Sequence, residues 1–320
     1  MSAATREAVA IIGTGLIGRG WAIVFARAGR EVRLYDAQPG ACAAALSEID
    51  RRLNDLRRYG LIAETQPILA RLLPRASLAD ATAGVALVQE CILETQPAKS
   101  AIFAELDRIT PRGAILASSS SAIPASAFTE HLPGRERCLV AHPANPPYLI
   151  PLVEIVPAPW TLPDVVERAH AIYRAADQEP IIVRREIHGF ILNRLQGALL
   201  NEAFRLVEDG YVDTEAIDKT VSCGLGLRWA FMGPFETIDL NAPHGVSDYA
   251  ARYGPMYYEM AQQQAQPRPW SEELVRRIES ERRRVLPADS LGERAVWRDK
   301  RLMLLAAHKA EAARKVDQRD

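Results

Sequence analysis

The residues best suited to chemistry lie in the segment CLVAHPANPPYLIPLVEIV, residues 138–156. His142 ends an apolar run, four prolines follow it, and the next apolar run contains one acid, Glu154. A neutral histidine can accept a proton near neutral pH, and a carboxylate on its other ring nitrogen fixes the required tautomer. A carboxylate on a buried strand also needs a partner, because its desolvation is otherwise costly. The pattern predicts that His142 and Glu154 form a general base, with a surface histidine in a rigid loop as the alternative.

A second motif lies at the start of the chain, in the segment AVAIIGTGLIGRGWAIVFARAGREVRLYD, residues 8–36. Gly13, Gly15 and Gly18 form a GxGxxG pattern between a β-rich run and a segment of helical length. Asp36 ends the next strand-like run, 21 residues after Gly15. The strand, glycines, helix and acid together are typical of a dinucleotide site, whereas the alternative is a glycine-rich turn in an unrelated α/β protein.

Each part of this motif has a physical role. Gly13 allows the tight turn, Gly15 lets a pyrophosphate approach the backbone, and Gly18 lets the helix pack on the sheet. Free N–H groups at the start of the helix would bind the phosphates, and Leu16 and Ile17 lie in this turn. An acid at the ribose favours NAD over NADP, because it repels a 2′-phosphate.

The elements that would position these residues alternate early in the chain. Strands are predicted at 9–12, 31–36, 85–93, 114–121, 138–142, 151–156 and 180–185, and two helices are predicted over 37–74. This order predicts a mostly parallel, doubly wound α/β sheet of Rossmann type, with ligands at the carboxyl ends of its strands. Glu94, His142 and the serines at 118–121 each follow such an end, although each alone could be an ordinary surface or capping residue.

The pattern changes to helices from Gly189 onward. Asp213 is expected to cap one of these helices, and the charged tail at 271–315 is expected to be helical. We therefore predict two domains, residues 1–188 for NAD binding and an all-α domain at 189–320 for substrate binding and dimerisation.

The bulk composition narrows the function. The 320 residues carry a net charge of −1, which provides no broad basic field for nucleic acid or an anionic membrane. The four cysteines form no CxxC and indicate neither a disulfide framework nor a metal site. No run is long enough to span a bilayer and no signal-peptide pattern is visible, so we expect a cytoplasmic location.

Several motifs together resemble the 3-hydroxyacyl-CoA dehydrogenase family, closest to its branch with lambda-crystallin and L-gulonate 3-dehydrogenase. They are GTGLIG with Asp36, VQECILE with Lys99, SSSSAIP, HPANPPYLIPLVEIV, GFILNRLQ and GLGLRWAFMGPFETIDLNA. The similarity runs from about residue 8 to residue 306. It implies an NAD-binding Rossmann domain, a helical domain that forms a homodimer, and a site between the two domains.

The resemblance also implies residue roles. His142, Glu154, Ser121 and Asn193 match the catalytic positions, with Ser121 and Asn193 at the substrate oxygen. The cofactor-side positions, in addition to the glycine turn, are Asp36, Glu94, Lys99, Ser121 and Asn145. Ser119 and Ser120 depart from the Asn-Thr usual in the acyl-CoA enzymes, so no role is carried over to them.

The implied reaction is NAD-dependent oxidation of the 3-hydroxyl of a small L-3-hydroxy acid to the 3-keto acid. A free carboxylate favours a forked donor, and Arg228 stands where the acyl-CoA members mostly have proline or apolar residues. We expect Arg228 to bind that carboxylate, with an interdomain salt bridge as the alternative.

Three other functions stay open. An L-3-hydroxyacyl-CoA dehydrogenase would need cations for the CoA phosphates, which Arg51, Arg52, Arg57 and Arg58 could supply. A carnitine 3-dehydrogenase would need an aromatic cage for the quaternary ammonium group. A catalytically silent structural or NAD(H)-sensing protein belongs to another class, and intact His142 and Glu154 disfavour it.

Overall fold

The computed structural model describes residues 7–317, which fold into two compact units. The first unit runs to Arg194 and takes in the segment from Ala295 onward, and the second comprises Leu195–Arg294. Each unit is described separately below.

The first unit contains one eight-stranded sheet in the order β3-β2-β1-β4-β5-β6-β7-β8. Its strands are β1 (Val9–Ile12), β2 (Val32–Tyr35), β3 (Leu72–Pro74), β4 (Leu87–Glu90), β5 (Ile115–Ser118), β6 (Cys138–Pro143), β7 (Leu152–Pro157) and β8 (Glu179–Ile182). Only β6 and β7 pair antiparallel. The predicted Rossmann-type, mostly parallel sheet is therefore confirmed.

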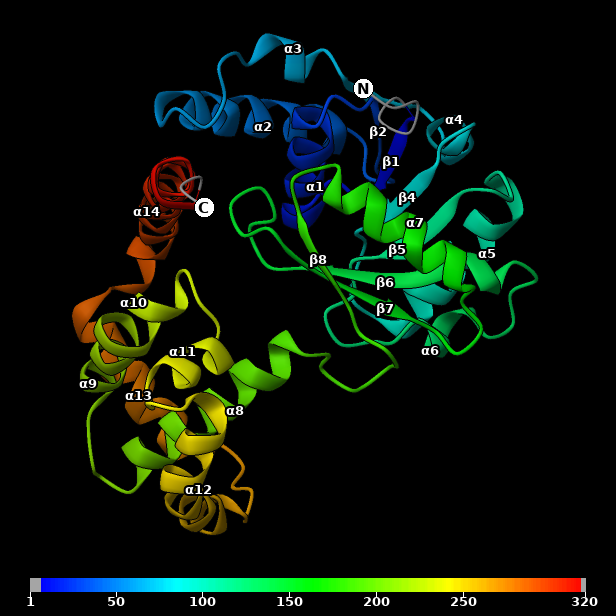
Figure 1. The fold of residues 1–320 in the computed structure, drawn as a ribbon. Helices are drawn as coiled ribbons and strands as arrows, with labels where there is room; N and C mark the ends of the chain where they lie inside the picture. Colours follow the sequence, from blue (N-terminus) through cyan, green and yellow to red (C-terminus); the bar gives the residue numbers. More distant parts are fainter. Residues whose placement is uncertain (1–6, 318–320) are drawn as a thin grey trace. The chain divides into compact units, whose positions relative to one another are not determined.

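Helices cover both faces of this sheet (Figure 1). They are α1 (Leu16–Arg27), α2 (Ala41–Arg58), α3 (Gln66–Leu69), α4 (Leu78–Thr82), α5 (Gln96–Ile109), α6 (Ser126–Thr129) and α7 (Pro163–Arg174). Val9 and Ile11 of β1 join a core with α1, α2 and α7. Ala10 and Ile12 join a separate core with α4, α5 and α6. Because successive strand residues point to opposite faces, the four-residue strand β1 contributes to both layers.

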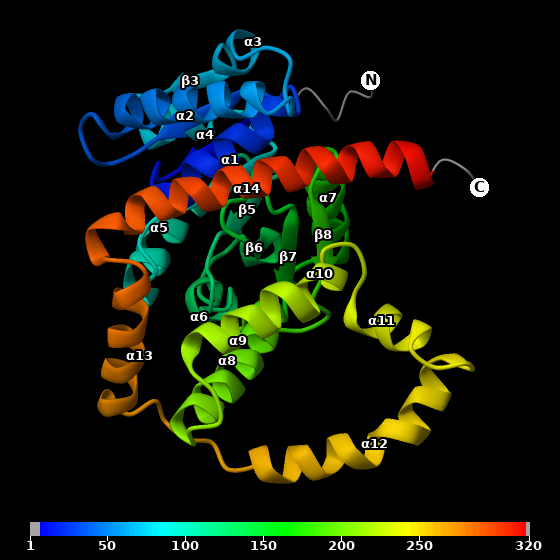
Figure 2. The same cartoon turned by 90° about the vertical axis from the view of Figure 1, so that its left-hand side faces the viewer.

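The last helix, α14 (Leu291–Ala312), returns to the first unit, where it runs beside α1 (Figure 2). Met303 is fully buried in the core that contains α1 and α2, and Arg52 Nη1 lies 3.4 Å from Asp299 Oδ2. The predicted boundary put 189–320 in one helical domain, whereas this packing assigns the chain's last segment to the first unit.

Of the two helices predicted over residues 37–74, the second, at 64–74, was wrong in its second half. Residues Gln66–Leu69 form the short helix α3, but Leu72–Pro74 form β3, at the edge of the sheet beside β2. Leu72 is buried in the core, and a three-residue strand is too short to show a period in the sequence. The expected cap at Asp213 is confirmed, because its Oδ1 accepts a hydrogen bond from Ala216 N at the start of the following helix.

The second unit is helical, as predicted. It contains most of α8 (Leu192–Glu208), then α9 (Thr214–Thr220), α10 (Gly226–Trp229), α11 (Pro234–Leu240), α12 (Gly245–Gln264) and α13 (Glu272–Val285). Only Val207, Thr237 and Leu274 are buried among its residues. Within residues 7–317, no helix combines the length and the hydropathy needed to cross a membrane.

Candidate active site

His142 and Glu154 lie opposite each other on the antiparallel strands β6 and β7. The His142 Nδ1 atom is 2.7 Å from Glu154 Oε2, and both side chains are buried. An ionised carboxylate can only accept, so Nδ1 carries the proton and Nε2 is left as the acceptor. No hydrogen bond is made by Nε2 within the described residues. The two residues therefore form the predicted pair, as directly opposed residues of neighbouring strands.

The second oxygen of Glu154 binds the start of α8. Glu154 Oε1 accepts hydrogen bonds from the backbone N–H groups of Ile191 at 2.7 Å and Leu192 at 2.9 Å. Burial alone would raise the pKa of Glu154, but the hydrogen bond from His142 and these two N–H groups lower it below its ordinary value. The carboxylate therefore stays ionised, which is the state that can orient and stabilise an imidazolium.

Phe190 closes one side of the histidine. Its ring is fully buried, and its centroid lies 5.7 Å from that of the His142 imidazole. Phe190 has φ 48° and follows Gly189 at φ 75°, so the chain turns sharply just before α8. A bulky residue rarely adopts positive φ, and such strain persists only where the surrounding structure imposes it. The turn aims the N–H groups of Ile191 and of Leu192, the first residue of α8, at Glu154.

Asn193 and Ser121, both predicted at the substrate oxygen, are joined to each other by a hydrogen bond. Asn193 Nδ2 donates to the backbone oxygen of Ser121 at 2.8 Å, while Ser121 N donates to Glu94 Oε1 at 2.8 Å. The Ser121 hydroxyl has no hydrogen-bond partner within the described residues, and Ser121 is exposed. Asn193 therefore holds the loop that presents this hydroxyl.

Glu94 fixes the same loop from the other side. It also accepts from the Ser120 hydroxyl at 2.7 Å and from Ala122 N at 3.4 Å. Its Oε2 lies 3.4 Å from Lys99 Nζ. Partial burial would raise the pKa of Glu94, but the Ser120 hydroxyl, Lys99 and the two backbone N–H groups lower it.

Lys99 is buried rather than open to a ligand. It is 1% exposed and lies 3.1 Å from Glu90 Oε2, whose side chain is 0% exposed. Its Nζ also donates to Ser118 Oγ at 3.3 Å, and Ser118 Oγ donates to Glu90. Lys99 therefore supports Glu94 through their ion pair, and its predicted place at the cofactor stays a prediction.

The three glycines of the turn between β1 and α1 have different surroundings. A Cβ on Gly13, which has φ 91°, would lie 2.7 Å from Cys91 O, and one on Gly18 would lie 1.9 Å from Gly13 O. A Cβ on Gly15 would meet nothing within 4 Å, and the φ of Gly15 is −65°. The protein itself thus explains Gly13 and Gly18 but leaves Gly15 open, as expected where a phosphate approaches the backbone. Leu16 and Ile17 follow as the first residues of α1.

Asp36, the residue after β2, is tied to this turn. Thr14 donates to Asp36 Oδ2 through its backbone N at 2.7 Å and its hydroxyl at 2.8 Å, and Gln38 N donates to Oδ1 at 3.0 Å. Partial burial would raise the pKa of Asp36, but the hydrogen bonds from Thr14 and Gln38 lower it. An ionised, fixed carboxylate beside the glycine turn fits a dinucleotide ribose.

Asn145 and Arg228 complete the set of predicted residues. Asn145 is exposed in the loop after β6, where it lines a small pocket of about 40 Å³ with Leu16. Arg228 belongs to α10 of the second unit and is exposed there. Its role in binding a substrate carboxylate stays a prediction.

Three features of the site were missed in the sequence: Phe190, the N–H groups of Ile191 and Leu192, and the buried Glu90. Phe190 sits in the segment GFILN, where a glycine just before a helical run could have indicated the turn. Nothing local marked Glu90 as a partner of Lys99, because the pair joins a strand to the following helix.

Two family descriptions match the chain. Residues 8–187 match the NAD binding domain of 3-hydroxyacyl-CoA dehydrogenase, and residues 189–285 match its C-terminal domain. Lambda-crystallin of Oryctolagus cuniculus is 41% identical over 310 residues, which are 95% of this chain and 96% of that protein. L-carnitine dehydrogenase of Oceanobacillus iheyensis is 37% identical over 248 residues, which are 77% and 80% of the two chains.

A solved structure of 5-formyl-3-hydroxy-2-methylpyridine 4-carboxylic acid 5-dehydrogenase, an NAD+-dependent dismutase, is also similar. It superposes with a TM-score of 0.71 at 28% identity, covering 87% of this chain and 95% of that one. The glycine turn and Asp36 fit NAD, and the family descriptions span nearly the whole chain. The chain is thus an NAD-dependent oxidoreductase and belongs to the 3-hydroxyacyl-CoA dehydrogenase family.

Proposed function

We propose that this protein oxidises the 3-hydroxyl of a small, free L-3-hydroxy acid with NAD, using His142 and Glu154 as the general base. The observation that carries the proposal is the geometry of Glu154. One carboxylate oxygen holds His142 Nδ1 at 2.7 Å and the other accepts two backbone N–H groups. Nε2 is therefore the nitrogen that can take a proton from a substrate hydroxyl.

In this mechanism the protein supplies the proton path and the orientation. When bound, NAD supplies the nicotinamide that accepts hydride from the substrate carbon. His142 Nε2 takes the hydroxyl proton, and Glu154 stabilises the imidazolium that forms. The Ser121 hydroxyl donates to the oxygen that becomes the carbonyl, and Asn193 positions Ser121 through the 2.8 Å bond to its backbone oxygen.

Two observations favour a free acid over a CoA thioester. Two of the arginines that could bind CoA phosphates already have acidic partners: Arg51 Nη2 lies 2.5 Å from Glu48 Oε2, and Arg52 lies near both Glu48 and Asp299. Two of the similar proteins are named for L-carnitine and for a pyridine carboxylic acid, neither of which is a thioester. The second candidate, an L-3-hydroxyacyl-CoA dehydrogenase, has support from the family's own name.

The experiment is NADH formation by purified protein with L-gulonate, L-3-hydroxybutyrate and L-3-hydroxybutyryl-CoA, beside the His142→Ala variant. Turnover of a free acid that is lost in the variant supports the proposal. Turnover of the thioester alone assigns the second candidate. NAD binding without turnover of any of the three would favour a structural or sensing protein.

Arg228 is the proposed ligand of the substrate carboxylate. The Arg228→Met variant should raise the KM for the free acid at least tenfold while leaving the KM for NAD unchanged, because a charged hydrogen bond is lost. Arg252→Met is a matched control in the same unit, since Arg252 pairs with Asp248 on its own helix. An unchanged KM for the acid would remove Arg228 from the site.

We also propose that the protein is a homodimer joined through the second unit. That unit buries only three residues, while large side chains such as Phe231, Phe235, Leu240 and Tyr258 are at least 66% exposed. Such exposure on a small helical unit is typical of an interface. Light scattering should give twice the mass of one chain. A cytoplasmic location stays a prediction.

A further inference from the structure

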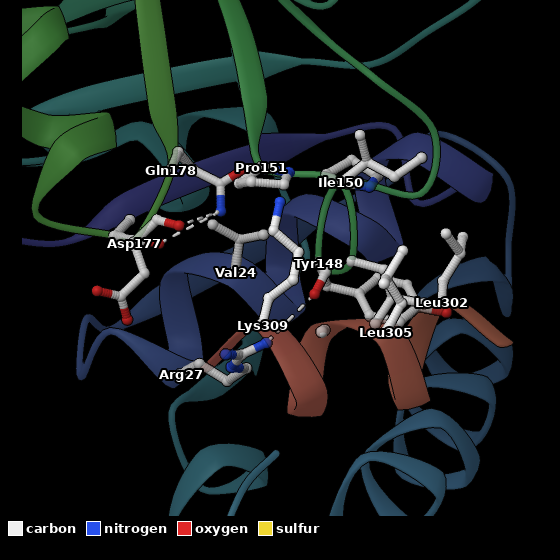
Figure 3. A pocket seen from close by; sticks show the side chains of 14 residues that line it. Val24, Arg27, Tyr148, Ile150, Pro151, Asp177, Gln178, Leu302, Leu305 and Lys309 are labelled. Atoms are coloured by element: carbon white, nitrogen blue, oxygen red, sulfur yellow. Dashed lines mark hydrogen bonds between the residues drawn. The ribbon is translucent and has the colours of Figure 1, made fainter. Parts of the chain in front are cut away.

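A pocket of about 470 Å³ lies in the first unit, away from the residues described above. Four elements enclose it: α1, the loop at 147–151, the turn between α7 and β8, and α14 (Figure 3). Neither His142 nor Glu154 lines this pocket, and none of the glycines of the β1–α1 turn does. Its volume is within the range of sites for small organic ligands.

Most of the lining is apolar. Val24 of α1, Ile150 and Pro151 of the loop, and Leu302 and Leu305 of α14 form its walls. In Figure 3 Val24 lies on one side of the Lys309 side chain, and Leu302 and Leu305 lie on the other. An apolar wall of this kind, with a few polar groups that converge on it, is the usual composition of a ligand pocket.

Arg27 is the first of those polar groups. It is partly buried at the end of α1, and its one hydrogen bond within the described residues runs from Nη1 to Tyr148 O at 3.3 Å. A guanidinium has five N–H donors, so most of its capacity is unused. Burial lowers the pKa of Arg27 and the charge of Asp177 only partly opposes this effect, so the cation is poorly compensated. A bound anion would compensate it.

Gln178 is the second group, and it is 5% exposed. Its Nε2 makes long contacts to Ala176 O at 3.4 Å and Asp177 O at 3.3 Å, but its Oε1 has no hydrogen-bond partner. Buried polar atoms without partners are rare in folded proteins, and each one calls for an explanation. A ligand that carries an N–H or O–H group would satisfy this oxygen.

The charges of the pocket favour an anion. Arg27 and Lys309 supply two cations and Asp177 supplies one carboxylate, which is exposed. In Figure 3 the Lys309 side chain extends toward Gln178 and Pro151, whereas the Asp177 carboxylate points away from them. The cations that line the pocket therefore outnumber the acid, with Lys309 near Gln178 and Arg27 near the Tyr148 backbone oxygen (Figure 3).

From the pocket, Arg27, Lys309 and the unpartnered oxygen of Gln178, we infer a second ligand site, for an amphipathic carboxylate. The carboxylate binds Arg27 and Lys309, an N–H or O–H group donates to Gln178 Oε1, and an apolar chain lies along Leu302 and Leu305. Such a ligand would contact residues 147–151, the loop that joins His142 to Glu154. It goes beyond the proposed reaction, because this site includes no residue of the active site.

The test is calorimetric titration of the NAD-loaded protein with N-hexanoylglycine. This probe has a carboxylate, an amide N–H and an apolar chain, and it has no hydroxyl that the enzyme could oxidise. We expect saturable binding, weaker binding of octanoate, which lacks the amide donor, and no binding of the N-hexanoylglycine methyl ester. Absence of binding by N-hexanoylglycine overturns the inference.

Variants locate the site. Arg27→Met and Lys309→Met should each weaken binding at least tenfold, since each removes a charged partner. Lys300→Met is the matched control, because Lys300 is exposed on the same helix but does not line the pocket, and it should bind normally. Binding that is equal in all three variants, or that is displaced by substrate of the active site, overturns the inference.

Gln178→Leu tests the proposed hydrogen bond to Gln178 Oε1 in a variant that is expected to fold normally. It removes the unpartnered oxygen from a buried position, so the variant should unfold at the same or a higher temperature than the parent. It should nevertheless lose at least fivefold in affinity for N-hexanoylglycine and little for octanoate. An equal loss for both probes would contradict the assigned hydrogen bond.

Discussion

Glu90 and Glu154 are two glutamates on the same sheet, and the side chains of both are 0% exposed. Glu90 ends β4 and pairs with Lys99 at 3.1 Å, with Ser118 and the N–H group of Ile92 as further donors. Glu154 lies within β7, and no lysine or arginine among residues 7–317 forms an ion pair with it. Its partners are an imidazole and two backbone N–H groups.

The difference separates a structural carboxylate from a reactive one. The ion pair of Lys99 and Glu90 links the strand β4 to the helix α5, and Lys99 also contacts Glu94, so this pair holds these parts in place. A histidine beside Glu154 can gain a proton, so the charge of that pair can change during a reaction. Burial is the same in both cases, and the nature of the partner decides the role.

The largest effect is expected at the reactive pair. Glu154→Gln should lower kcat on the order of 10²–10⁴-fold, because the amide cannot stabilise an imidazolium and can favour the wrong tautomer. The KM for NAD should be unchanged, as measured by initial rates. A loss of less than tenfold would show that His142 works without Glu154 and would remove the distinction between the two carboxylates.

The structural pair should affect stability instead. Lys99→Met leaves Glu90 buried without a cation, which should cost about 3–5 kcal/mol of unfolding free energy. The measurement is urea unfolding. Lys99→Met combined with Glu90→Leu should recover part of the loss, because an apolar pair removes the unpaired charge. No recovery in the double variant would mean that the charges themselves are not what matters there.

The glycine turn offers a comparison of the same kind. Gly18→Ala should destabilise the protein, since its Cβ would lie 1.9 Å from Gly13 O. Gly15→Ala should fold normally, because its Cβ meets nothing within 4 Å, and yet should raise the KM for NAD about tenfold or more. Thermal unfolding and initial rates distinguish the two. A normal KM in Gly15→Ala would contradict the approach of a phosphate at that residue.

The smallest effect is a dependence of stability on pH. The folded state lowers the pKa of Glu154 from its ordinary 4.5, so this group stabilises the protein above about pH 4.5. This stabilisation by Glu154 is lost as the pH falls from 4.5 through the lower pKa that Glu154 has in the folded state. The difference in melting temperature between wild type and Glu154→Gln should therefore shrink between pH 6 and pH 3. A difference that is constant over this range would show that Glu154 is not held ionised by folding.

The sequence alone was sufficient for the features with local signals. Some features depend only on residues that are close together in the sequence, so spacing and periodicity predict them. They are the glycine turn, Asp36, the alternation of strands and helices, and the change to helices at Gly189. His142 and Glu154 were recognisable as candidates for the same reason, since a histidine after an apolar run and an acid within one are local anomalies.

Only the tertiary structure decided which distant residues meet. The antiparallel register sets His142 directly opposite Glu154, and the turn at Phe190 aims two N–H groups at that carboxylate. The burial of Lys99 against Glu90 and the return of α14 to the first unit likewise depend on contacts between separate elements. Such contacts depend on register and packing, which bring together residues far apart in the chain and leave no periodic mark in the sequence.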